Sequence, residues 1–144
     1  MPETFNRAKR ELRFDRATIN IRNLRLRTFI GFNPEERVKK QDVVLNIQIS
    51  YLPSPAILND QVDGALNYKM ITKAVIKLVE EGRFLLLEKL VADVLATCSS
   101  PPEVTHASVT IDKPHALRFA ESVSLTLEYN ANTDQTMNLL EKAS

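Results

Sequence analysis

Cysteine and glycine are scarce in this sequence. The 144 residues include one cysteine, Cys98, and three glycines, Gly31, Gly64 and Gly82. A single cysteine cannot form a disulfide within the chain, and an unpaired thiol is typical of a reducing compartment, so we expect a cytoplasmic protein. Three scattered glycines form no glycine-rich phosphate loop, which argues against a dinucleotide cofactor.

Strong ligands for a metal ion are equally few. Besides Cys98 there are two histidines, His106 and His115, and these three residues do not show the close spacing of zinc sites. We interpret His106, inside a predicted strand, as a packed or solvent-facing side chain. The sequence also lacks a G-x-S-x-G elbow and an H-E-x-x-H pair. We expect no metal centre and none of the hydrolase mechanisms that these motifs support.

An excess of charge of one sign and long apolar runs are missing too. Nineteen Lys and Arg oppose eighteen Asp and Glu, a net charge of +1, so no global field attracts nucleic acid. The longest aliphatic-aromatic run, residues 84–87, is far too short to span a bilayer. Residues 1–16 carry charges where a signal peptide has an apolar segment. We expect no nucleic-acid partner, no membrane span and no signal peptide.

Alternating apolar residues predict four β-strands. The first covers residues 18–26, where the alternation changes parity near Asn23 and indicates a β-bulge. The second covers 43–51, the third 107–111 and the fourth 123–129. Lys113 is expected just beyond the third strand, because Pro114 should stop further pairing.

Between the second and third strands the apolar period becomes helical. One helix is expected after Asn67, a plausible N-cap, and should stop at Gly82. The next has an apolar stripe from Leu86 to Cys98, and two prolines follow it. The order ββααββ predicts an α+β fold, with both helices on one face of a four-stranded antiparallel sheet.

The length suits one domain, which we place at residues 17–129, with a polar N-terminal extension at 1–16 and a polar C-terminal tail at 130–144. Four strands would leave two open sheet edges. Pairing such edges between subunits is a physical reason to expect a homo-oligomer.

Four polar residues are candidates for chemistry. Glu88 lies at the border of the second helix's apolar stripe, Lys113 follows the third strand, Tyr68 begins the first helix, and Glu36 occupies the loop between the first two strands. Each also has a purely structural explanation. An acid in a first helical turn is stabilised by the helix dipole, turn and loop charges are usually solvated, and a phenol at a helix start packs its ring. These residues alone leave both explanations open.

Four segments resemble, in order and spacing, the dihydroneopterin aldolase/epimerase family. They are 30–37 (IGFNPEER) ending in Gln41, 67–68 (NY), 86–89 (LLEK) and 111–114 (IDKP), and the resemblance spans about 17–129. Segments 23–31 (NLRLRTFIG), 65–68 (ALNY) and 112–124 (DKPHALRFAESVS) are most similar to the branch of triphosphate 2′-epimerases. Aldolases typically carry an aromatic-Gly-x-His-Gly loop, and residues 28–32 (TFIGF) lack its histidine.

The resemblance implies a tunnelling fold (T-fold), in which subunits join their sheets into a barrel and two rings stack as a homo-octamer. Active sites then lie between subunits and cleave the side chain of a reduced pterin, without a metal or another cofactor. Glu88 would anchor the pterin together with groups at Leu87 and Leu66. Lys113 and Tyr68 would transfer protons.

The resemblance also places Glu36 at the side-chain end of the substrate. A triphosphate there would need cations, and Arg118 is our first candidate, with His115 close to it in sequence. Further cations are available at Arg27, Arg37, Lys39 and Lys40. Two alternatives stay open: an aldolase of folate biosynthesis that releases glycolaldehyde, and a non-catalytic pterin-binding member.

Overall fold

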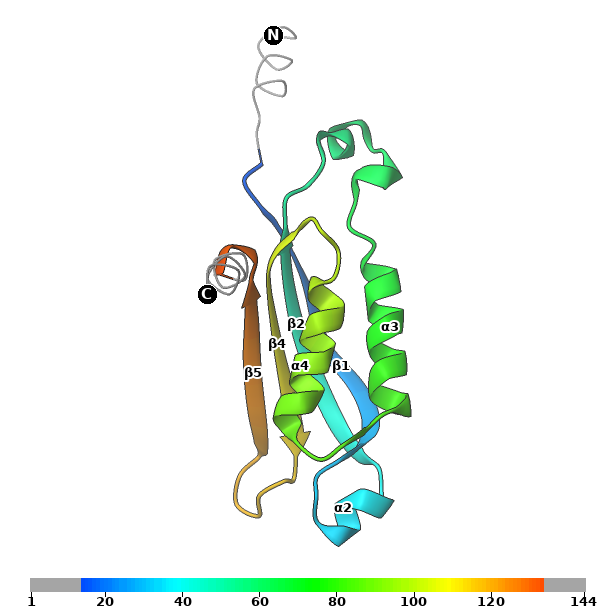
Figure 1. The fold of residues 1–144 in the computed structure, drawn as a ribbon, viewed down its shortest axis with the longest axis vertical. Helices are drawn as coiled ribbons and strands as arrows, with labels where there is room; N and C mark the ends of the chain where they lie inside the picture. The colour runs from blue at the N-terminus through cyan, green and yellow to red at the C-terminus, as the bar shows by residue number, and fades with distance from the viewer. Residues whose placement is uncertain (1–13, 134–144) are drawn as a thin grey trace, which may run out of the picture.

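A curved sheet with two long helices on one face makes up residues 14–133, the part of the chain that the computed structural model describes (Figure 1). The strands are β1 (Ala17–Ile30), β2 (Gln41–Tyr51), β3 (Arg83–Phe84), β4 (Val104–Pro114) and β5 (Ser122–Asn130). The helices are α2 (Pro34–Val38), α3 (Tyr68–Glu81) and α4 (Leu87–Ser99), and two 3-10 turns, η1 (Pro55–Asn59) and η2 (Val62–Gly64), precede α3.

The sheet has the strand order β3-β1-β2-β4-β5. The four long strands pair antiparallel, and β3 adds a parallel pairing with the end of β1 at Phe29 and Ile30. The prediction of four strands was therefore wrong by one, because a two-residue strand is too short to show alternation. The predicted bulge is confirmed: the β1–β2 register shifts between Ile21 and Leu24, and Asn23 has a φ of 54°.

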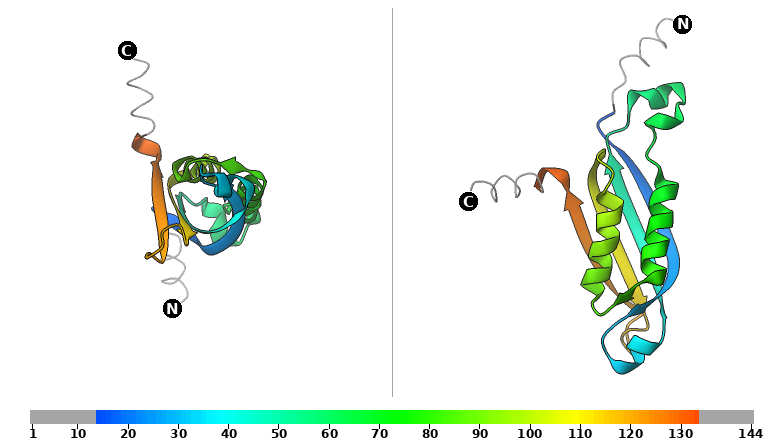
Figure 2. Two further views of the ribbon diagram at one scale, coloured as in Figure 1. Left: turned by 90° about the horizontal axis from the view of Figure 1, so that it is seen from below. Right: turned by 45° about the vertical axis from the view of Figure 1, so that its right-hand side comes forward.

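Both long helices lie on the same face of the sheet, as the two views of Figure 2 show. Their apolar side chains join those of the strands in one core. The caps agree with the sequence: Asn67 Oδ1 accepts a hydrogen bond from the Met70 N–H at 3.1 Å, and Gly82 is the C-cap of α3. The buried core between the layers contains aliphatic side chains of every long strand except β5, whose Leu125, Leu127 and Tyr129 pack against it partly buried.

Two strands, β1 and β4, continue well past their predicted ends. β1 continues to Ile30 because Thr28, a fully buried polar residue, occupies a core position, where its hydroxyl donates to the Gly82 carbonyl at 3.3 Å. β4 continues through Lys113 to Pro114, which pair with β5. A proline is tolerated there because β2 pairs with β4 only as far as Asp112, so Pro114 has a neighbouring strand on one side.

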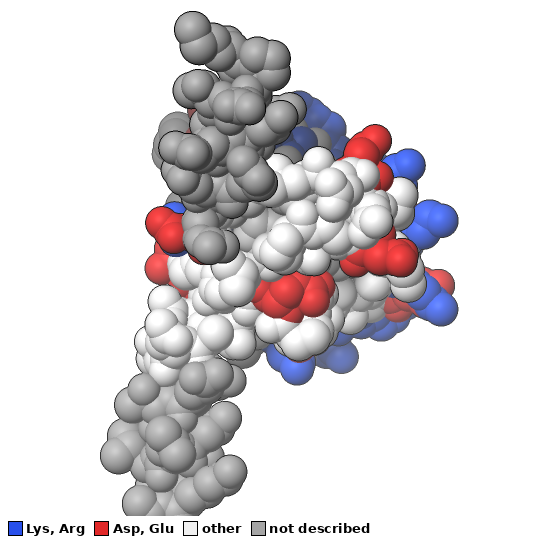
Figure 3. Space-filling view, turned by 90° about the horizontal axis from the view of Figure 1, so that it is seen from above, with Lys and Arg blue, Asp and Glu red and all other residues white. Residues whose placement is uncertain are grey.

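The other face of the sheet is polar, and none of the described helices covers it. β5 forms one edge of the sheet, and most of β1 forms the other, since β3 reaches only its last two residues. At the end that carries η1 and η2, uncharged and acidic residues share much of the visible surface (Figure 3). No described helix has both the length and the apolarity that a membrane span requires.

Candidate active site

An ion pair between Glu36 and Lys113 connects α2 to the end of β4. Lys113 Nζ donates to Glu36 Oε2, and the two side chains are only 14% and 20% exposed, respectively. Lys113 has the same parity along β4 as the buried residues Val109 and Ile111, so its side chain leaves the sheet on the helix-covered face. The pair therefore lies at one end of the core, not on the open face.

Glu36 is oriented by its own helix. The prediction of a loop at this position was wrong: Asn33 caps α2 by accepting from the Glu36 N–H at 2.9 Å, with Pro34 in the first turn. Gln41 Nε2 donates both to Glu36 Oε2 at 3.1 Å and to the Ile30 carbonyl at 2.6 Å, which ties the carboxylate to β1. The sequence did signal this helix, because Asn33 and Glu36 have capping-box spacing.

The charge of Glu36 follows from these contacts. The hydrogen bond from Lys113 lowers the pKa of Glu36 below its ordinary value of 4.5, while burial acts in the opposite direction and the bond from Gln41 lowers it further. Glu36 is thus a carboxylate at neutral pH. It serves as an acceptor and a counter-ion, not as a proton donor.

Gly31 makes room for this carboxylate. It has a φ of 124°, and a Cβ built on it would overlap the carboxylate group of Glu36. Its N–H donates to the Phe84 carbonyl at 2.9 Å, which brings the segment before α4 next to the ion pair.

A cavity of about 260 Å³ opens beside Glu36, lined by Phe29, Gly31, Glu36, Arg37, Arg83, Phe84 and Leu85. α4 begins two residues after Leu85, so Leu87 and Glu88 lie at the same end of the molecule. Glu88 is exposed in the first turn of α4, whose N-cap Leu86 provides no side-chain hydrogen bond. The structure thus brings four expected site residues, Glu36, Lys113, Leu87 and Glu88, to one end.

Tyr68 and Leu66 are at the opposite end. Tyr68 is the first of the 14 residues of α3, and the helix ends at Gly82, next to β3. At ~1.5 Å per residue, Tyr68 therefore lies roughly 20 Å from the Glu36 end of its own subunit. It is 48% exposed and lines a different cavity with Ile19 and Ile21, whereas Leu66 is buried.

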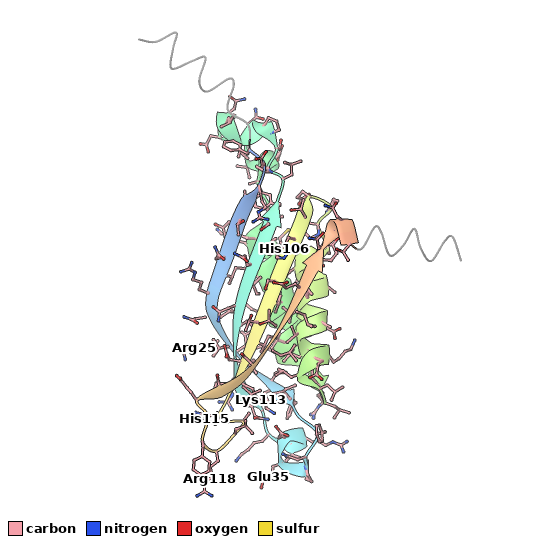
Figure 4. All side chains as sticks on the ribbon, turned by 90° about the vertical axis from the view of Figure 1, so that its left-hand side faces the viewer. Arg25, Glu35, His106, Lys113, His115 and Arg118 are labelled. Atoms are coloured by element: carbon pink, nitrogen blue, oxygen red, sulfur yellow. The ribbon has the colours of Figure 1, made fainter. Side chains whose placement is uncertain are left out.

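His115 and Arg118 belong to the loop between β4 and β5. Figure 4 shows them at the Lys113 end of the molecule, with His106 well away along the sheet. His115 has a φ of 63° and lines a cavity of about 330 Å³ together with Arg25 and Arg27. Arg118 is exposed, and its guanidinium carbon lies 5.3 Å from the centre of the Phe119 ring.

Residues 14–133 contain no group of three or more His, Cys, Asp or Glu that could hold a metal ion. Cys98 is buried among the core residues, and burial raises the pKa of its thiol to about 12. The thiol is therefore protonated at neutral pH and is a poor nucleophile.

The comparison with known proteins decides the family. The family model described as dihydroneopterin aldolase matches residues 19–128. The chain belongs to the dihydroneopterin aldolase family.

Within this family the chain is 51% identical over 111 residues to dihydroneopterin triphosphate 2′-epimerase of Pseudomonas aeruginosa, covering 77% of this chain and 90% of the relative. It is 50% identical over 113 residues to the protein of the same name in Escherichia coli, covering 78% of this chain and 94% of the relative. The crystal structure of E. coli dihydroneopterin aldolase in complex with neopterin superposes with a TM-score of 0.73 at 25% identity, covering 79% of this chain and 99% of that one.

These likenesses confirm the expected tunnelling fold, now with a fifth, very short strand. They also confirm that the family is one of enzymes that act on pterins. Sequence reasoning did not single out Gln41 as a site residue, although it ended the first family segment. It missed Arg83 entirely, because a charged residue in a two-residue strand has no recognisable pattern.

Proposed function

We propose that this chain is a dihydroneopterin triphosphate 2′-epimerase, which converts 7,8-dihydroneopterin triphosphate into 7,8-dihydromonapterin triphosphate. The observation that carries the proposal is the shielded Glu36–Lys113 ion pair beside a cavity, in a chain about half identical to two proteins of that name. The pair provides charged groups next to a space that a small polar ligand can enter.

The pterin is assigned to the start of α4. A 2-amino-4-oxo pyrimidine presents adjacent N–H groups, and the carboxylate of Glu88 can accept two of them in a fork geometry. Glu88 is accessible at the helix start, beside the main chain of Leu87. The neopterin complex of the E. coli aldolase supports a ligand of this chemical class.

The reaction is a retro-aldol cleavage followed by an aldol addition. Lys113 acts as the neutral amine, after its ammonium proton has been released to solvent, and takes the proton of the 2′-hydroxyl on Nζ. The C1′–C2′ bond then breaks, and its electron pair moves into the conjugated C=N of the reduced pterin. The 2′ carbon becomes the carbonyl of a two-carbon aldehyde that carries the phosphates. If the aldehyde turns and is attacked on its other face, the same proton returns to the 2′ oxygen and the centre is inverted.

Tyr68 takes part from a neighbouring subunit in this proposal. Within one subunit Tyr68 and Lys113 are separated by about the length of α3. A single chain therefore does not bring both proton-transfer groups together. A subunit that places the start of its α3 against the Lys113 end of the next would complete the site. The open edges formed by β1 and β5 provide the main-chain pairing for such an assembly, expected to be an octamer.

A second function is supported by the family description and by the likeness to the E. coli aldolase. If the aldehyde leaves before it is attacked again, protonation of the pterin carbon gives a hydroxymethyl product and the enzyme is an aldolase. The residues involved are the same, and only the fate of the aldehyde differs.

The test is to incubate the purified protein separately with dihydroneopterin triphosphate and with dihydroneopterin, oxidise the products and separate the fluorescent pterins. Monapterin from the triphosphate supports the epimerase. Hydroxymethylpterin from the unphosphorylated substrate as the main product would replace it with the aldolase, and no product from either would favour a pterin-binding protein.

A further inference from the structure

The cavity beside Glu36 contains two arginines that the reaction described above does not use. Arg37 follows Glu36 in α2, and Arg83 comes from β3. Both line the same cavity of about 260 Å³ as Glu36 itself. Two cationic side chains therefore share a cavity with the carboxylate that is assigned to the side-chain end of the substrate.

Arg83 is held in place before any ligand arrives. Its guanidinium carbon lies 3.9 Å from the centre of the Phe29 ring, and its Nη1 donates to the Arg37 carbonyl at 3.2 Å. That bond uses one of the five N–H donors of the side chain. A guanidinium that is stacked on an aromatic ring and hydrogen-bonded loses little conformational freedom when it binds an anion, and its planar fork matches phosphate oxygens.

The charge balance of the cavity favours an anion. Its lining includes Arg37, Arg83 and one acid, Glu36, which is already paired with Lys113. Lys40 Nζ lies 5.8 Å from the centre of the same Phe29 ring and adds a further positive charge.

The neighbouring cavity with Arg25 and Arg27 is less suited to an anion. Asp42 and Glu80 line it as well, and Arg27 already contacts Asp42 at 3.5 Å and donates to the Lys40 carbonyl at 3.1 Å. The two acids balance the two arginines.

We propose that Arg83 and Arg37 bind the phosphate chain of the substrate, with Arg83 oriented by Phe29. This inference rests on the proposed function, because it extends the site from the 2′ carbon near Glu36 and Lys113 to the phosphorylated end of the side chain. It makes Arg83 a determinant of the preference for a phosphorylated over an unphosphorylated pterin.

The test compares Arg83→Gln with Arg25→Gln and Arg118→Gln, each of which removes one positive charge at the same end of the molecule. For Arg83→Gln we expect the Michaelis constant for dihydroneopterin triphosphate to rise about 10- to 100-fold, the usual worth of a hydrogen bond between charged groups. The Michaelis constant for unphosphorylated dihydroneopterin should rise much less than the constant for the triphosphate, so that the preference for the phosphorylated pterin falls. Phe29→Leu should cause a smaller rise, about two- to fivefold, because the guanidinium remains but is no longer stacked.

A binding measurement separates this inference from the proposed function. Inorganic tripolyphosphate is titrated calorimetrically into the wild-type oligomer and into each variant, with Arg37→Gln as a second variant in case Arg83→Gln does not fold. Weaker tripolyphosphate binding in the Arg83 or Arg37 variant supports the phosphate site, even if the wild type epimerises nothing and the proposed function fails. Equal losses for both pterins, unchanged tripolyphosphate binding, or a selective loss only at Arg25 or Arg118 would overturn it.

Discussion

Glu36 and Lys113, 77 positions apart in the sequence, form an ion pair where α2 meets the end of β4. Neither side chain is in its expected setting: Glu36 is in a capped helix, and Lys113 is inside a paired strand. Their contact connects the segment between β1 and β2 with the end of β4. It also creates the most shielded pair of charges among the ion pairs of the described residues.

Replacement of Lys113 by alanine should lower turnover by about 100- to 10,000-fold, since the proposed reaction then lacks its proton-transfer group. The oligomer should still assemble, because Lys113 is at the end of β4 and outside the hydrophobic core. Product chromatography and size-exclusion chromatography measure the two effects. Lys77→Ala, an exposed position on α3, is the matched control. A Lys113→Ala enzyme with wild-type rate would remove the lysine from the mechanism.

Gly31→Ala should reduce both stability and activity. The new Cβ would collide with the carboxylate of Glu36, and the φ of 124° is one that alanine rarely adopts, at a cost of about 1–3 kcal/mol. Thermal melting together with the epimerase assay tests this. Gly64→Ala is the comparison, because its Cβ would lie 3.1 Å from Ala56 Cβ and would make no contact with Glu36. If both variants melt and react alike, the close approach of Gly31 to Glu36 has no consequence.

The Glu36 ion pair should make stability depend on pH in the acid range. The pKa of Glu36 is lowered in the folded protein, so the unfolded chain binds the extra proton first as the pH falls. The stabilisation is fully present above the ordinary value of 4.5 and is lost as the pH drops through the lower folded value. Glu36→Gln should therefore be less stable by about 1–3 kcal/mol at pH 7, and this difference should shrink towards pH 3. Urea unfolding at several pH values measures it; a difference that is constant with pH contradicts the pairing.

A site shared between subunits should allow two inactive variants to rescue each other. Lys113→Ala and Tyr68→Phe subunits, each assembled alone, should have little activity. After mixed refolding at equal amounts, about a quarter of the sites should combine an intact Lys113 of one subunit with an intact Tyr68 of another, if the subunits assemble at random. Recovery of about that fraction of wild-type activity is the expected result. No recovery in oligomers shown by mass spectrometry to be mixed would place both residues in one chain's site.

Much of the fold could be predicted because the signals are local. The change of parity at Asn23, the cap at Asn67 and the stop at Gly82 each depend on a few neighbouring residues. The features that the sequence did not predict depend on contacts with distant residues. Thr28 is buried by its contact with Gly82, and Lys113 is in a strand through its pairing with Val123, so neither is visible from sequence neighbours.

The candidate site was harder to predict from the sequence than the fold was. Residues important for chemistry were named from a family resemblance, since composition and periodicity alone favoured purely structural explanations for Glu36, Glu88 and Lys113. Arg83 was not named at all, because its role depends on a ring 54 positions earlier, that of Phe29.

By itself, the sequence determined the order of the long strands and long helices, the caps of α3 and the bulge near Asn23, because hydrophobic period and capping chemistry act over a few residues. Only the tertiary structure decided which side chains meet. Strand register and helix packing place Glu36, Gln41 and Lys113 together and leave Tyr68 at the far end of α3. The physical reason is that contacts between segments far apart in the sequence depend on how the whole sheet pairs. A pattern over a few neighbouring residues does not specify that pairing.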